Sequence, residues 1–131
     1  GAIVVGASRV RRSLDAVWVL LDERAPNTAY GPCIDLFAPG DSVLLPSMDA
    51  RGRVVSQLWN GTSMSAGYVS GAAALFLEAH PSATPDQVAD HLRASSSATI
   101  VDASRSPRAG MLYVGPAAEV TRRMLATAAR R

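Results

Sequence analysis

A serine follows a glycine turn and leads directly into a long apolar segment, a place in the sequence well suited to chemistry. The turn and its serine are Asn60-Gly61-Thr62-Ser63, and small or apolar residues continue to Leu77. If this run is a helix, its free backbone N–H groups and its positive dipole end can stabilise an oxyanion beside the Ser63 oxygen. Gly61 would allow a substrate backbone to approach closely. The residue types therefore permit a nucleophilic serine at position 63.

The same position has a purely structural interpretation, because serine is one of the preferred N-cap residues of helices. From spacing alone, a capping Ser63 is the favoured alternative. Neither histidine of the chain suits the role of its base. His80 lies 17 positions further on, and a helical rise of about 1.5 Å per residue separates the two by roughly 25 Å. His91 falls on the next helix, where a partly exposed surface position is expected.

The elements that must position Ser63 follow from the apolar pattern. From Ser63 onward almost no polar face remains before His80, which predicts a helix buried in the middle of its domain. Thr84-Pro85-Asp86-Gln87 forms a capping box and starts a second helix that ends near Ala94. Short apolar runs predict strands at 2–6, 33–38, 42–45, 54–59, 98–101 and 111–114, while 17–21 fits a strand or a short helix. Asp49 to Gly52 is predicted to form a hairpin-like turn before the strand at 54–59. Short strands alternating with helices indicate an α/β fold with a mainly parallel sheet.

Composition narrows the class of protein. The chain has 131 residues, 48% of them hydrophobic, and a net charge of +2, which suits one small globular core. The arginines gather at 9–12 and 122–131 without interleaved aromatic residues, so nucleic-acid binding is not expected. No apolar run approaches the roughly 20 residues of a membrane span. Residues 115–131 are predicted to form a basic, Ala- and Arg-rich helical tail with a solvated face, and an anionic partner is the alternative.

The segment from Gly61 to Ala66 reads Gly-Thr-Ser-Met-Ser-Ala and resembles the nucleophile motif of subtilisin-like serine proteases. Three more segments are similar to the same family in the same order: 4–7, 30–40, and 81–88 together with 112–113. The last two resemble its proteinase K and aqualysin branch. The likeness covers about residues 2 to 114. It implies the C-terminal part of a subtilisin-like catalytic domain, with Ser63 as nucleophile of an endopeptidase acting on polypeptides. Asn60, Gly61 and Thr62 are then expected at the oxyanion hole and substrate edge.

The family arranges its triad as Asp, His and Ser along the chain, and no histidine precedes Ser63 here. The chain also opens directly on a strand, without a start methionine or signal peptide. The resemblance therefore implies that the acid, the base and the oxyanion asparagine belong to an upstream half, a partner without which this chain is inactive. Gly67-Tyr68 stands where the family usually has Pro-His. This departure keeps a pseudoprotease or a non-catalytic interaction fragment as the alternative.

Two further residues acquire roles from the resemblance. It implies no cofactor for catalysis, but it places a structural calcium at Asp35, bound together with main-chain oxygens near Ala2. The alternative is an aspartate satisfied by backbone N–H groups. Cys33 is the single cysteine and matches one that the aqualysin-like group bridges to an upstream cysteine. That pairing would indicate an exported protein, and the alternative is a free thiol.

Overall fold

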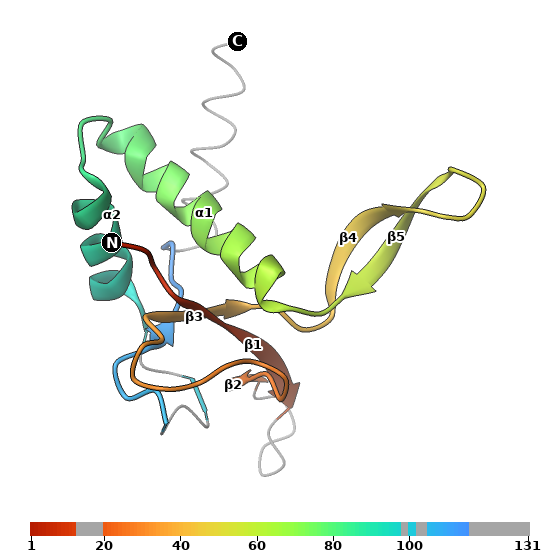
Figure 1. The fold of residues 1–131 in the computed structure, drawn as a ribbon, viewed down its shortest axis with the longest axis horizontal. Helices are drawn as coiled ribbons and strands as arrows, with labels where there is room; N and C mark the ends of the chain where they lie inside the picture. Colours follow the sequence, from red (N-terminus) through yellow and green to blue (C-terminus); the bar gives the residue numbers. More distant parts are fainter. Residues whose placement is uncertain (13–19, 98–99, 102–104, 116–131) are drawn as a thin grey trace.

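The computed structural model describes residues 1–12, 20–97, 100–101 and 105–115. Two helices lie on one side of a small sheet, and a separate hairpin projects away from this body (Figure 1). The elements in chain order are β1 (Val5–Arg12), β2 (Leu20–Arg24), β3 (Leu36–Pro39), β4 (Val43–Met48), β5 (Val54–Trp59), α1 (Thr62–Ala79), α2 (Pro85–Ser95) and β6 (Gly110–Met111).

The main sheet has the strand order β2-β1-β3-β6. Strand β3 runs parallel to both β1 and β6, whereas β2 pairs with β1 in the antiparallel sense. The predicted α/β fold with a mainly parallel sheet is confirmed, with an antiparallel strand at one edge. For the segment 17–21, which fitted a strand or a short helix, Leu20 and Leu21 lie in the edge strand β2. Residues 13–19 lie outside the described residues.

The opening strand begins at Val5 rather than at Ala2, and the contacts of Val4 explain the difference. The first ladder pair joins Val5 to Leu36. One residue earlier, the Val4 N–H donates to the Asp35 side chain instead of to a strand backbone, at 2.8 Å. The pairing of β1 with β3 therefore starts at Val5, one residue after the contact between Val4 and the Asp35 side chain. Sequence periodicity does not reveal such a contact.

Strand β3 lies at the centre of the core, and its alternating side chains serve both faces of the sheet. Leu36 and Ala38 pack with residues of α1 and α2, while Phe37 packs on the other face with Ile34 and Met111. Leu36, Phe37 and Ala38 are fully buried, whereas Pro39 at the end of β3 is partly buried. The helix-side cluster consists of Leu36, Ala38, Val69, Ala72, Val88 and Leu92.

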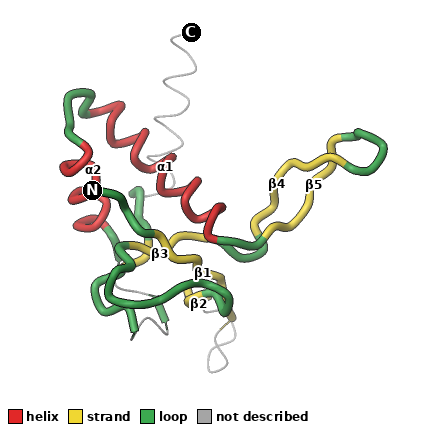
Figure 2. Tube along the Cα trace, viewed as in Figure 1, coloured by secondary structure: helices red, strands yellow, loops and turns green. Residues whose placement is uncertain are grey.

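Helix α1 is present where the sequence predicts it, but it is buried along one side only. Its buried residues are Ser65, Val69 and Ala72, which face β1, β3 and α2. Tyr68 and Gly71, on other sides, are exposed. The reason is geometric, because the described part of the chain places its sheet and second helix on a single side of α1 (Figure 2).

The predicted capping box of α2 is confirmed. The Gln87 N–H donates to Thr84 Oγ1 at 3.3 Å, and the Thr84 N–H donates to Gln87 Oε1 at 2.8 Å. The helix runs to Ser95, one residue beyond the expected end. Val88, Ala89 and Leu92 form its buried face, as the sequence predicts.

The hairpin of β4 and β5 has the predicted turn, in which Asp49 N–H donates to Arg53 O and Gly52 has a φ of 73°. The strand candidate at 111–114 is shorter than predicted, whereas 98–99 of the candidate at 98–101 lie outside the described residues. Strand β6 contains two residues, and Val101 makes an isolated bridge to Glu23. The predicted helical tail falls on 116–131, which lie outside the described residues.

Candidate active site

Ser63 is the second residue of α1, and Gly61 is the N-cap. The N-cap interpretation of Ser63 is therefore wrong. Gly61 has a φ of 149°, a backbone conformation that residues with a Cβ rarely adopt, so a glycine is required where the turn enters the helix. Ser63 is exposed, and within the described part of the chain no hydrogen bond engages its hydroxyl. The hydroxyl is thus available to a group from outside.

Two contacts hold the turn in front of Ser63. The Gly61 N–H donates to Gly40 O at 2.7 Å, and the Ser42 N–H donates to Asn60 Oδ1 at 2.6 Å. Asn60 therefore clamps the turn to the segment between β3 and β4. Thr62 is exposed, and its side chain has no hydrogen-bond partner among the residues that the structure describes. A place for Asn60, Gly61 and Thr62 at the substrate edge stays a prediction.

Ser65 is a positioning residue that the sequence analysis did not identify. It is fully buried, and its Oγ donates to Ala38 O at 2.9 Å, which ties the first turn of α1 to the end of β3. A Cβ at Gly40 would overlap Ser65 Oγ and the Ala7 side chain, so a glycine is needed for this close approach. The available signal was the spacing, because Ser65 precedes the apolar Val69 by four residues and shares its helix face.

The start of α1 can stabilise negative charge next to the Ser63 oxygen. The first N–H groups of an α-helix have no intrahelical acceptor, and the dipole adds partial positive charge at the same end. No acidic residue lies in the first turn of α1 to oppose this. The geometry therefore suits an oxygen on which negative charge develops.

A groove of about 880 Å³ runs along the exposed side of α1, beginning at Ser63. Its walls are largely apolar and include Met64, Tyr68, Leu75 and Val43. Gly67 also lines it and has no atom within 4 Å of the place where a Cβ would stand. Both departures from the family motif, Gly67 and Tyr68, thus border the same open groove as the candidate nucleophile.

Both histidines lie at the far end of α1 from Ser63. His80 is the C-cap, and its ring stacks on Phe76 at 4.4 Å between centroids. His91, which belongs to α2, also stacks on Phe76, with 4.1 Å between ring centroids. A helix of this length separates its ends by roughly 25 Å at 1.5 Å per residue. Neither histidine reaches the Ser63 hydroxyl.

Asp35 lies immediately before β3 and contacts two other parts of the chain. Its Oδ2 accepts from the Val4 N–H at 2.8 Å, and its Oδ1 accepts from Arg93 Nε at 2.9 Å. Burial alone would raise the pKa of Asp35, but the Val4 N–H and the Arg93 side chain outweigh it and hold the pKa below 3.8. Among the described residues, no three His, Cys, Asp or Glu side chains gather as a metal cluster.

Cys33 is exposed and is a free thiol within the described part of the chain. Exposure leaves its sulfur accessible to a cysteine from elsewhere. A disulfide with an upstream cysteine stays a prediction. No helix in the described ranges is long and apolar enough to cross a bilayer.

Comparison with known proteins decides the family. The model of the subtilase family of peptidases matches residues 1–114. The chain belongs to the subtilase family. A cold-adapted subtilisin-like serine proteinase of known structure superimposes on this subtilase chain with a TM-score of 0.64 and 28% sequence identity. The match covers 87% of the chain and 37% of that structure.

Two curated relatives of this subtilase chain are proteinases. An extracellular serine proteinase from Thermus sp. (strain Rt41A) is 46% identical over 71 residues, which are 54% of the chain and 17% of the relative. A subtilase-type proteinase of Schizosaccharomyces pombe, named for the sexual differentiation process, is 35% identical over 89 residues. That match covers 68% of the chain and 16% of the relative. The chain thus spans about a sixth of either relative.

Proposed function

We propose that this subtilase chain carries the nucleophile of a serine-type endopeptidase and that Ser63 attacks the carbonyl carbon of a peptide bond. The observation that carries the proposal is the place of Ser63, exposed in the first turn of α1 beside an open groove. Attack forms the bond from Ser63 Oγ to the carbonyl carbon and moves the carbonyl electron pair onto oxygen. The N-terminal N–H groups of α1 would stabilise that oxyanion.

The reaction also needs a base, because a serine hydroxyl is a poor nucleophile until its proton is taken by a group within about 3 Å. The base then gives this proton to the leaving amine as the C–N bond breaks, and water releases the acyl group from Ser63. We infer that the base, its aspartate and the oxyanion asparagine come from outside this chain. The separation of Ser63 from His80 and His91 supports this inference, as does the 37% share of the solved relative that the chain covers.

The open side of α1 is the surface on which we expect that remaining part of the domain to pack. It carries apolar side chains such as Tyr68 and Leu75 next to small residues such as Gly67 and Gly71. Small residues allow close approach of another backbone. Alone, the chain is expected to be inactive. We further propose that the intact protein is exported, in line with the extracellular Thermus relative. A disulfide from Cys33 to an upstream cysteine would fit the same compartment.

Labelling with a fluorophosphonate, which modifies activated serines, tests the proposal. We expect the intact protein to be labelled on the peptide that contains Ser63, while Ser63→Ala and the chain of residues 1–131 alone stay unlabelled. Ser70→Ala is the matched control, because Ser70 lies on the same helix and donates only to Ala66 O. Absence of label on folded intact protein would instead favour a pseudoprotease that uses this region as an interaction surface.

A further inference from the structure

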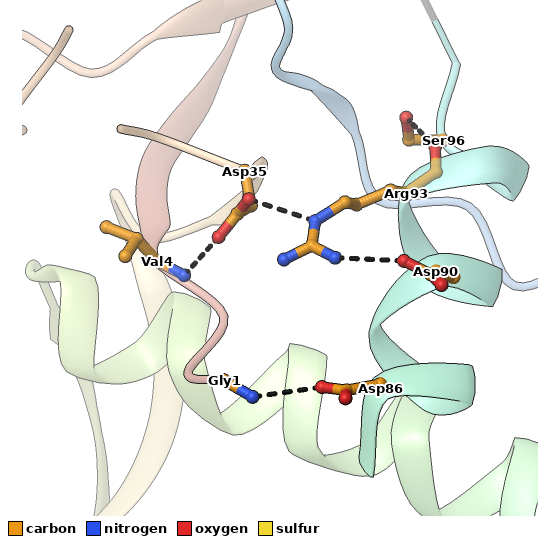
Figure 3. Close-up of polar contacts among 7 residues, drawn as sticks. All are labelled: Gly1, Val4, Asp35, Asp86, Asp90, Arg93 and Ser96. Carbon is orange, nitrogen blue, oxygen red and sulfur yellow. Dashed lines mark hydrogen bonds and ion pairs between the residues drawn. The ribbon is translucent and has the colours of Figure 1, made fainter. Parts of the chain in front are cut away.

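The carboxylate of Asp35 lies where β1, β3 and α2 meet (Figure 3). Each of its oxygens already has a donor, the Val4 N–H at Oδ2 and Arg93 Nε at Oδ1. The backbone strengthens the same junction, because the Asp35 N–H donates to Val4 O at 2.9 Å. The Asp35 side chain is 23% exposed, so its charge is partly shielded from water and a positive group beside it is favourable.

Arg93 supplies that positive group from the last turn of α2. Its Nη1 also lies 3.2 Å from Asp90 Oδ1, but the Asp90 side chain is 78% exposed, which makes Asp35 the more sheltered partner. The Ser96 hydroxyl donates to Arg93 O at 2.8 Å and fixes the backbone from which the guanidinium extends. A cation at a helix C-terminus is further favoured by the helix dipole.

The neighbours of this ion pair are core residues. Leu36 follows Asp35 and Leu92 precedes Arg93, and both belong to the buried cluster between the sheet and the helices. The two charged residues are 58 positions apart in the chain and approach because their apolar neighbours pack together. The contact therefore ties the end of α2 to the starts of β1 and β3.

We propose that the Arg93 guanidinium takes the place of a divalent cation at Asp35, so that this junction is held by an internal ion pair and does not bind calcium. Calcium requires about six to eight oxygen ligands around it. A guanidinium has only donors and no lone pair to offer, and here it brings positive charge to the same carboxylate. The calcium expected at Asp35 and the observed ion pair thus compete for one side chain, and the residues present do not fit the metal.

The test is thermal unfolding of the intact protein in excess EDTA and in excess calcium chloride. The variants are Arg93→Gln, Asp35→Asn and their combination. Asp90→Asn is the matched control, because it removes the other, exposed carboxylate that pairs with Arg93. In EDTA we expect either single change to lower the midpoint by roughly 2 to 4 °C. The double variant should be no less stable than the worse single one, because both changes remove the same contact. Asp90→Asn should have a smaller effect.

Calcium bound elsewhere in the intact protein should raise the midpoints of wild type and Asp35→Asn equally. A larger calcium response in wild type than in Asp35→Asn would overturn the proposal, because it would show calcium on this carboxylate in the presence of Arg93. Arg93→Lys and Arg93→Gln provide a test that leaves Asp35 intact. Midpoints in EDTA equal to wild type in both would show that the ion pair does not hold the junction.

Discussion

At the scale of single residues, buried polar side chains determine where the candidate nucleophile lies. Ser65 is fully buried, and its hydroxyl holds the start of α1 against Ala38 O and Pro39 O, at 2.9 and 3.2 Å. Gly40 leaves the space that this contact requires. Ser63, two positions earlier in the chain, takes its place in the groove as a consequence.

We predict that Ser65→Ala lowers the free energy of unfolding of the intact protein by about 1 kcal/mol, because a buried carbonyl loses its donor. Denaturant unfolding measures this loss. The same variant should react more slowly with a fluorophosphonate at Ser63, since the first turn of α1 is then held less firmly.

Ser70→Ala is the matched control for Ser65→Ala. Ser70 is on the same helix, but its hydroxyl is exposed and donates only to Ala66 O within the helix. Both changes improve intrinsic helix propensity alike. Equal unfolding free energies for Ser65→Ala and Ser70→Ala would refute the anchoring role of Ser65.

The residue scale also shows what one sequence can and cannot predict about a site. The motif around Ser63 predicts the position of the serine, because a glycine turn before an apolar run is a local pattern. The contact between Asp35 and Arg93 joins residues 58 positions apart, and only the packing of their apolar neighbours brings them together. The local pattern predicted the capping box of α2 but favoured Ser63 as the N-cap of α1, where the N-cap is Gly61. Ion pairs across elements depend on the tertiary fold.

At the scale of elements, boundaries follow the sequence where a local hydrogen bond sets them. The capping box of α2 and the turn at Asp49 are closed by neighbours in the chain, and both were predicted. The start of β1 was predicted too early, because the Asp35 side chain takes the Val4 N–H. The two-residue length of β6 likewise depends on its partner β3 and not on its own apolar run.

We predict that Thr84→Ala costs about 1 kcal/mol of stability, since it removes the side-chain acceptor of the Gln87 N–H at the start of α2. Helix α2 carries Leu92 into the core, so the loss should be transmitted to global unfolding. Urea denaturation of the intact protein measures it. Thr84→Ser keeps the hydroxyl and is the control, and a Thr84→Ala variant as stable as Thr84→Ser would contradict the prediction.

At the scale of the whole molecule, this chain leaves much apolar surface uncovered. The helix α1 was expected to be buried on all sides, and the described chain covers only one of them. The sequence could not reveal this, because an apolar helix indicates that burial is required and not which segment provides it. The chain covers 37% of the solved subtilisin-like relative. We expect the rest of such a domain to lie over the groove and to bury the sides of α1 that the described chain leaves exposed.

The hairpin of β4 and β5 adds a second apolar surface. Leu44 lies opposite Leu58, and Met48 lies opposite Val54. These pairs share one face of the hairpin because side chains alternate along a strand. Their exposed fractions lie between 64% and 78%. A two-stranded ribbon with such a face is marginal in water on its own.

We therefore expect residues 1–131, expressed alone, to self-associate, with light scattering that rises with protein concentration and without a sharp thermal transition. Leu44→Lys with Leu58→Lys places charge on the apolar face of the hairpin and should reduce the scattering. Gln57→Lys puts a charge on the opposite face of β5 and should have little effect. A monomer that melts in one cooperative transition would contradict the expectation. Equal scattering from Leu44→Lys/Leu58→Lys and Gln57→Lys would instead shift the cause to the open side of α1.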